Sequence, residues 1–128
     1  MAIPGSSDGQ EVLRRGTVHN LSNAATSLSF DGTITSAATS NETVPANHII
    51  TMLSMSWVDQ SNGAELISLY MVYGGNAHSI LHEQDLAAYA TFIFEEKFVL
   101  IGGDALFTIM ASSTNVDLWY SYLDQDWS

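Results

Sequence analysis

The feature that most constrains the fold of this chain is an alternation of apolar and polar residues with a period of two. Residues 49–57, 67–73 and 116–123 all show it. Successive side chains of a strand point to opposite faces, so each run predicts a strand with one apolar face. The predicted inward residues are Ile49, Thr51, Leu53, Met55 and Trp57; Ile67, Leu69, Met71 and Tyr73; and Val116, Leu118, Tyr120 and Tyr122.

Residues 91–94, 98–101 and 105–111 are further short β-rich runs. No strands alternate with long helical segments, so the pattern favours an all-β fold, an antiparallel β-sandwich or jelly roll, over a parallel sheet. The only stretch with helical character is residues 79–90, where Leu81, Asp85 and Tyr89 would share a face. A short turn or loop fits that stretch about as well.

The apolar residues are distributed unevenly along the 128 residues. Residues 1–47 are rich in Ser, Thr, Asn, Gly and Ala, whereas all three tryptophans and all five tyrosines follow position 47. A chain of this length suits one domain. We therefore expect an extended N-terminal arm over residues 1–16 and a single β-sandwich domain over residues 17–128.

The charge balance excludes several classes of partner. Fourteen acidic residues stand against only Arg14, Arg15 and Lys97, which gives a formal net charge of −11. Nucleic acid is a poor partner for such a chain, because duplex binding depends on Lys and Arg neutralising phosphates. No apolar run approaches the length of a membrane span, and no secretory signal is visible, so we expect a soluble protein that is made inside a cell and has no membrane partner.

A metal site is the first chemistry to consider, although without cysteine the chain has no thiolate ligands. His78 and His82 are four residues apart and Glu83 follows, with His19 and His48 as possible further ligands. The sequence lacks the glutamate that a zinc protease motif places between its two histidines. Two ligands do not hold a structural zinc ion, so we interpret the histidines as a surface pair and predict no metal and no cofactor.

Catalytic groups are equally hard to assemble. The adjacent acids Glu95 and Glu96 would point to opposite faces of a strand, and Asp124 and Asp126 lie in an acidic tail. No Gly-x-Ser-x-Gly segment supplies a nucleophile. Residues 31–35 and 59–65 contain Asp and Asn oxygens, but neither matches an EF-hand and both suit ordinary turns. We predict no catalytic residue and no enzymatic activity.

The segment Gly102-Gly103-Asp104 joins two apolar runs. Glycine tolerates positive φ and aspartate can accept bonds from nearby backbone donors, so the trio predicts a tight turn between antiparallel strands. The predicted core residues on its two sides are Val99, Ile101, Phe107 and Ile109.

Six residues are predicted to bind a partner. Arg14 and Arg15, two of only three basic residues, adjoin the expected arm. They could tether the arm to the chain's own acidic surface, or could pair with carboxylates of another subunit while Val12 and Leu13 supply an apolar anchor. Near the other end of the chain, Trp119 and Leu123 would be exposed apolar groups if only one face of the last strand is buried, and burial of both faces is the alternative.

The order of these segments resembles a small β-sandwich found among virion proteins of tailed bacteriophages. The similarity spans about residues 44–123: a strand such as "HIITMLSMSW", a second such as "ELISLYMVYGG", a variable loop with "ILHEQDL", then "FVLIGGDALFTIMASSTNVDLWYSYL". In this chain Ile-Gly-Gly stands where such proteins more often have Glu-Ala-Gly or Pro-Ala-Gly, and the leader "EVLRRGTVHNLSN" lies outside the similarity.

The resemblance implies a structural protein in the virion, synthesised in the cytoplasm of a bacterial host. It favours a capsid decoration or cement protein that binds the major capsid protein and forms a homo-oligomer, with a trimer preferred. A neck or tail component is one alternative. A carbohydrate-binding jelly-roll module is another, with the aromatic candidates Trp57, Trp119, Trp127 and Tyr73.

Overall fold

A computed structural model describes residues 10–30, 42–112 and 115–127, and in these residues the chain forms nine strands and no helix. None of its described segments is therefore a helix that could cross a membrane. The strands are β1 (Gln10–Leu21), β2 (Thr26–Ser27), β3 (His48–Asp59), β4 (Glu65–Tyr73), β5 (Asn76–Leu86), β6 (Thr91–Phe94), β7 (Phe98–Ile101), β8 (Ala105–Met110) and β9 (Val116–Asp126).

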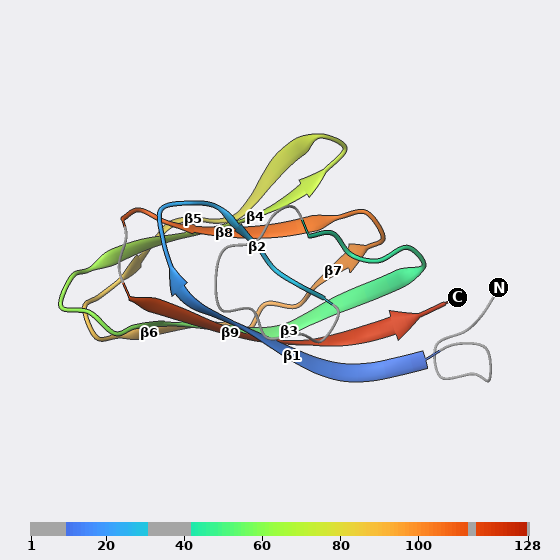
Figure 1. The fold of residues 1–128 in the computed structure, drawn as a ribbon, viewed down its shortest axis with the longest axis horizontal. Coiled ribbons are helices and arrows are strands. Elements are labelled where there is room, and N and C mark those ends of the chain that lie inside the picture. The colour runs from blue at the N-terminus through green and yellow to red at the C-terminus, as the bar shows by residue number, and fades with distance from the viewer. Residues whose placement is uncertain (1–9, 31–41, 113–114, 128) are drawn as a thin grey trace.

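The strands form two layers, which Figure 1 shows one above the other. Sheet A has the order β1-β9-β3-β6, and β7 also pairs with β3. Sheet B has the order β2-β8-β4-β5. Every pairing is antiparallel, so the predicted all-β sandwich is confirmed.

The strand order is that of a jelly roll. β7 pairs with the first part of β3 and β6 with the second part, so β6 and β7 act together as one interrupted strand. With that strand counted once, the first strand pairs with the last, the second with the next to last, and so on inward to the hairpin of β4 and β5. This nested antiparallel pairing in two sheets is the jelly-roll arrangement.

The core lies between the two sheets and is dominated by aromatic side chains. Trp57, Tyr120 and Tyr122 are almost completely buried, and the Trp57 Nε1–H donates to Thr108 Oγ1 at 3.2 Å. The predicted inward face of residues 116–123 is confirmed, as is burial of Ile67 and Leu69 in β4. Other buried members of this core are Val18, Leu21, Leu28, Phe30, Ile50, Met52, Met55, Leu100, Leu106, Val116 and Leu118.

The prediction for β3 is right only in its second half. Met55 and Trp57 point inward, but in the first half the buried residues are Ile50 and Met52, not their odd-numbered neighbours. The register with β9 shifts between Met52 and Ser54, which leaves Leu53 as an extra residue. A β-bulge of this kind reverses which positions face the core, and a simple alternation cannot anticipate it.

Residues 79–90 contain no helix: residues 79–86 belong to β5, and only residues 87–90 form a turn. This strand is the outer strand of sheet B and only Leu86 in it is buried, so its apolar pattern is weak. Two register shifts against β4 disturb the alternation further. An edge strand with one buried residue needs few apolar side chains, so β5 has no clear period of two. Its few apolar residues happen to be spaced as on a helix.

The turn at Gly102-Gly103-Asp104 forms as predicted, but the faces assigned to its flanks are wrong. The Asp104 N–H donates to the Ile101 carbonyl at 3.0 Å, the Ile101 N–H donates to Asp104 Oδ2 at 2.9 Å, and Gly103 has φ of +93°. Val99 and Ile101 are 54% and 49% exposed. The turn does not close a hairpin: β7 belongs to sheet A and β8 to sheet B. Buried positions beside it are Leu100, Leu106, Thr108 and Met110, whereas Phe107 and Ile109 are half-buried.

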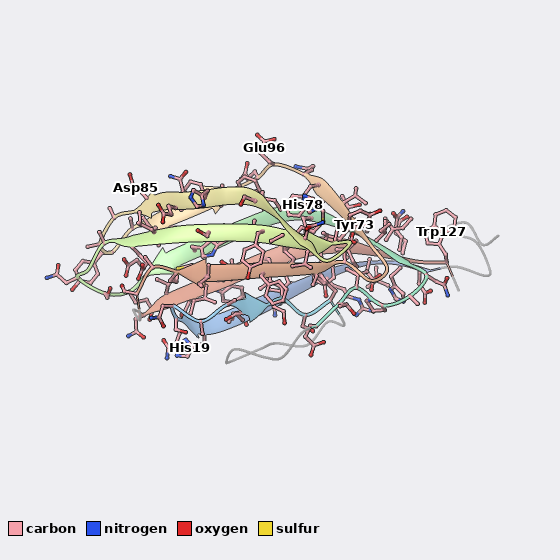
Figure 2. All side chains as sticks on the ribbon, turned by 90° about the horizontal axis from the view of Figure 1, so that it is seen from above. His19, Tyr73, His78, Asp85, Glu96 and Trp127 are labelled. Carbon is pink, nitrogen blue, oxygen red and sulfur yellow. The ribbon has the colours of Figure 1, made fainter. Side chains whose placement is uncertain are left out.

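The N-terminal residues that the structure describes are part of sheet A. Residues 10–16 are the first part of β1, and they pair in regular register with β9. Residues 1–9 lie outside the described part of the chain. The expected arm therefore corresponds, from Gln10 onward, to a paired strand that lies along one side of the molecule (Figure 2).

Candidate functional site

The outer face of sheet A is built from residues that lie opposite one another on neighbouring strands. Directly opposed residues of an antiparallel pair share a face of the sheet. Three rows cross all four strand positions of this face, from β1 through β9 and β3 to β7 or β6. They are Glu11, Gln125, Ile49 and Ile101; Leu13, Leu123, Thr51 and Val99; and Thr17, Trp119, Ser56 and Ile93.

These rows carry several leucine, isoleucine, valine and tryptophan side chains on a face that points to solvent. Single exposed apolar residues are common, whereas a contiguous set marks an interaction surface. Among the residues that the structure describes, seven large hydrophobic side chains are exposed, and five of them are on this one face. They are Leu13 (69% exposed), Ile93 (56%), Val99 (54%), Trp119 (51%) and Ile101 (49%). Ile49 and Leu123, which are half-buried, lie between them.

Few charges interrupt this surface. Its strand positions carry only Glu11, Arg15 and Asp117, although the chain has fourteen acidic residues. Asp117 is held by its own neighbours: Oδ1 lies 2.7 Å from His19 Nδ1 and Oδ2 accepts from Gln60 Nε2 at 2.7 Å. The acidic excess therefore lies mainly elsewhere, and a partner can cover this face without burying many carboxylates.

The six predicted partner-binding residues divide between two faces of sheet A. Leu13, Arg15, Trp119 and Leu123 are on the outer face, where Trp119 is exposed rather than buried on both sides of its strand. Val12 and Arg14 are opposite Asp124 and Tyr122, which point inward. Whether any of the six binds a partner remains a prediction.

Arg14 has a partner within the chain. Its Nε lies 3.1 Å from Asp124 Oδ2, and the other oxygen of that buried carboxylate is 2.7 Å from His48 Nδ1. His48 Nε2 is 3.7 Å from Asp126 Oδ1. This arrangement matches the tether alternative for Arg14, because a carboxylate that is only 4% exposed requires such compensation. Arg15, by contrast, makes no ion pair with any described residue.

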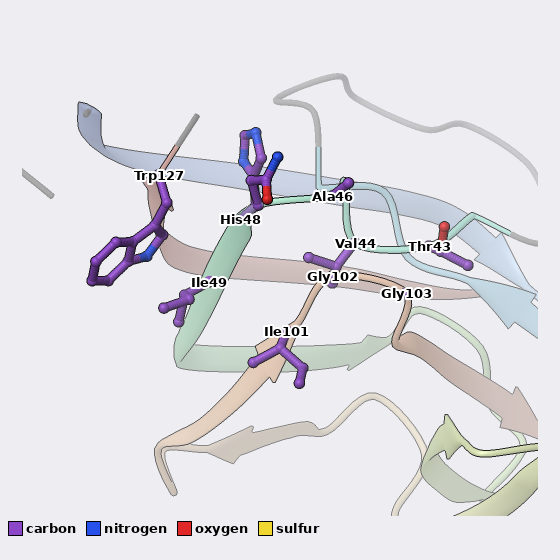
Figure 3. A pocket seen from close by; sticks show the side chains of 10 residues that line it. Thr43, Val44, Ala46, His48, Ile49, Ile101, Gly102, Gly103 and Trp127 are labelled. Carbon is purple, nitrogen blue, oxygen red and sulfur yellow. The ribbon is translucent and has the colours of Figure 1, made fainter. Parts of the chain in front are cut away.

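A hollow of about 1070 Å³ opens at the end of the sandwich where β3 begins and β9 ends. Figure 3 shows Trp127 and Ile49 on one side of it and Ile101 and Val44 on the other. The Trp127 Nε1 atom is buried and has no hydrogen-bond partner. Because Ile49 and Ile101 also belong to the outer face of sheet A, the hollow extends the apolar surface to the rim of the molecule.

The remaining candidate residues do not converge. His78 and His82 are exposed on β5, and in Figure 2 His78 lies close to Tyr73 and far from His19. Among the described residues, no group of three or more His, Asp or Glu side chains could hold a metal ion. Glu95 and Glu96 are exposed between β6 and β7.

The loop of residues 59–65, one of the two segments with Asp and Asn oxygens, is an ordinary turn. Asp59 is buried, and its Oδ1 accepts bonds from the Ser61 N–H and hydroxyl at 2.9 and 2.7 Å, which is a turn and not an open ligand set. Residues 31–35 lie outside the described part of the chain.

The aromatic residues proposed for carbohydrate binding are scattered. Trp57 is in the core with no exposed surface, so it cannot stack on a sugar. Trp119 is on the outer face of sheet A, Tyr73 ends β4 in sheet B, and Trp127 lies at the end of the molecule (Figure 2). Only Trp119 of these four belongs to the apolar face.

The sequence-based prediction missed three of the five exposed hydrophobic residues of this face. Ile93, Val99 and Ile101 were not predicted as partner-binding, because the strand-face assignment placed Val99 and Ile101 in the core. The signal that could have identified them is the sequence of the interrupted strand: Phe92, Phe94, Phe98 and Leu100 form an alternating inward set, which leaves the residues between them outside.

No family model matches this chain, and no curated protein matches it. Among solved structures, a chain from the structure of infectious bursal disease virus, Gx strain, is similar over 89% of this chain at 12% sequence identity, with a TM-score of 0.44. The match covers 33% of that chain, so this protein spans about a third of its length. A likeness of this degree assigns no function.

Proposed function

We propose that this protein is a non-enzymatic structural component of a virus particle, which attaches to a larger protein assembly through the outer face of sheet A. The observation that carries the proposal is the concentration of five exposed hydrophobic side chains on this one face of sheet A. Jelly rolls occur in viral capsid proteins and in lectins, so the fold is compatible with the role without specifying it.

In its finer form the proposal is a bacteriophage capsid decoration protein bound to the major capsid protein, with a neck or tail position as the alternative. The mechanism is mechanical. Covering the face removes apolar surface from water at roughly 25 cal/mol per Å², before the cost of association is subtracted. Symmetry repeats the contact over the shell, so many modest contacts stabilise it together.

Gold-labelled antibody against the purified chain, applied to virus particles from the host that produces it, tests the location. Label spread over the head supports a decoration protein. Label at one vertex or along the tail supports the neck or tail alternative. Particles without label, imaged beside a labelled capsid control, contradict a virion role.

Rebinding of purified protein to particles that lack it tests the surface. Trp119→Ala should weaken binding by at least about tenfold, because a half-exposed tryptophan that becomes buried in an interface is a typical hot spot. Tyr73→Ala is the matched control, since Tyr73 is 58% exposed but belongs to sheet B. Equal losses in the two variants, or none in either, would refute the assignment of the face. Binding of the purified chain to a glycan array, lost in Trp119→Ala, would favour the carbohydrate module instead.

A further inference from the structure

β1 is an edge strand of sheet A, and only one of its two hydrogen-bonding sides is paired with a described strand. Among the described residues it pairs with β9 alone, and it runs for 12 residues along one side of sheet A. In Figure 2 this side carries His19 and lies opposite Asp85 and Glu96. The backbone groups of an edge strand that point away from its sheet can pair with another strand.

The edge lacks most of the features that normally prevent such pairing. Residues 10–21 contain no proline and no lysine. Register with β9 is regular from Gln10 to Val18, and the irregularity falls only at the far end, where Asn20 has φ of 56°. The Arg14 side chain is engaged with Asp124 on the inner side. The half of β1 nearest Gln10 is therefore regular in register and open to pairing on its free side.

The outer face of this half has a self-complementary pattern. Glu11, Leu13 and Arg15 succeed one another at a spacing of two, so they share that face. A two-fold axis through Leu13, with two copies of β1 antiparallel, places Glu11 of each copy opposite Arg15 of the other and Leu13 opposite its equivalent. Opposite charges in directly facing positions stabilise an antiparallel pair. Arg15 makes no ion pair within the described part of its own chain.

We propose that β1 pairs antiparallel with β1 of a second copy, centred on Leu13, so that two A sheets join into one continuous sheet. The occupant is a second copy because the charge pattern is complementary to itself under a two-fold rotation, which is the symmetry of most homodimers. The contact closes at two copies, so it differs from the trimer that the bacteriophage resemblance favours. The pairing does not rest on the proposed function, because its backbone bonds form at the edge of sheet A, although Leu13 contributes to both the edge and the outer face.

Charge exchange tests the register. The wild-type chain should be a dimer by sedimentation equilibrium. Glu11→Arg and Arg15→Glu should each raise the dimer dissociation constant by at least about tenfold, since each variant turns two attractive pairs into repulsive ones. The double variant Glu11→Arg/Arg15→Glu should dimerise again, and an equimolar mixture of the two single variants should form a heterodimer. A double variant that dimerises no better than either single variant would overturn the register.

A disulfide tests the axis, because the chain has no cysteine of its own. Opposed residues in an antiparallel pair have Cα atoms about 4.5–5.5 Å apart, within the range of a disulfide. Leu13→Cys should therefore form a covalent dimer on mild oxidation. Thr17→Cys is the matched control on the same strand and face: its two copies would be about 26 Å apart, at about 3.3 Å per residue, and should not cross-link.

A monomeric or trimeric wild-type chain, or equal cross-linking of the two cysteine variants, would overturn the proposal. Trp119→Ala separates this result from the proposed function. It should leave the dimer unchanged while it weakens attachment to particles, and its loss of the dimer would also contradict edge pairing.

Discussion

Replacing Gly16 by alanine tests how β1 is held on sheet A. Gly16 is opposite Tyr120, and a Cβ atom at position 16 would lie 2.7 Å from Tyr120 Cε1 and still closer to Cζ and Oη. The ring has little room to move away. It is 2% exposed, its centroid lies 5.9 Å from that of Tyr122, and its hydroxyl donates to the Ser29 carbonyl at 2.7 Å. Alanine must therefore displace a packed and hydrogen-bonded tyrosine.

The expected loss of stability combines two effects. Overpacking a core costs about 1–3 kcal/mol. Moving the hydroxyl also loses its bond to the Ser29 carbonyl and the bond that it accepts from the Ser29 N–H, at about 1 kcal/mol each. Alanine is more favourable than glycine in a strand, which offsets about 0.5–1 kcal/mol of this loss of stability. The Gly16→Ala variant should thus be about 3 kcal/mol less stable than the wild type.

Urea denaturation followed by circular dichroism measures this loss, and a double-mutant cycle identifies its cause. Tyr120→Leu removes the atoms that alanine would meet, at its own cost of about 2–4 kcal/mol. In that background Gly16→Ala should be neutral or slightly stabilising. The reasoning is refuted if Gly16→Ala lies within about 0.5 kcal/mol of the wild type, or if it costs the same in both backgrounds.

The other predictions concern buried polar groups and the turn between the sheets. Glu65 is 3% exposed, and its Oε1 accepts hydrogen bonds from the backbone N–H groups of Leu66, Ala111 and Ser112. Glu65→Ala should therefore lower the free energy of unfolding by about 3 kcal/mol in urea denaturation. Glu65→Gln keeps an oxygen acceptor and should lower it by clearly less. Gly103→Ala should cost about 1–2 kcal/mol because of its φ of +93°. Gly63 does not have a positive φ and its added Cβ would make only an ordinary contact with Ser61 Oγ at 3.9 Å, so Gly63→Ala should leave the melting temperature nearly unchanged.

The strands of the last part of the chain could be predicted because their alternation is regular. Val116–Asp126 has the same pattern of buried and exposed positions in the structure as in the sequence, apart from its final residues. Its inward residues Tyr120 and Tyr122 are large and buried, so the alternation correctly identified which face of β9 contributes to the core. Exposure of Trp119, one of the two alternatives that the sequence left open, follows from the same alternation.

The alternation of apolar residues predicted the wrong buried face at a β-bulge and at the turn where the chain passes from one sheet to the other. The bulge at Leu53 reverses the faces within a single strand, and both halves still look like good strands in the sequence. At Gly102-Gly103-Asp104 the turn was correctly expected, but turn chemistry does not say whether the next strand joins the same sheet. Val99 and Ile101, two of the five exposed residues of the candidate surface, were therefore assigned to the wrong face.

The apolar face and the β1 edge can act together, because pairing at the edge leaves the face uncovered. Leu13 belongs to both: its backbone would lie at the two-fold axis and its side chain in the row that continues through Leu123 and Thr51 to Val99. Joining two A sheets at that point places two such rows end to end. A dimer would then bind a repetitive shell through two equivalent surfaces, and the second attachment would be intramolecular. Each face of the dimer can then bind weakly and the dimer still attaches firmly, because both faces bind at once. In this way the charge pattern of the β1 edge would support the attachment proposed for the outer face of sheet A.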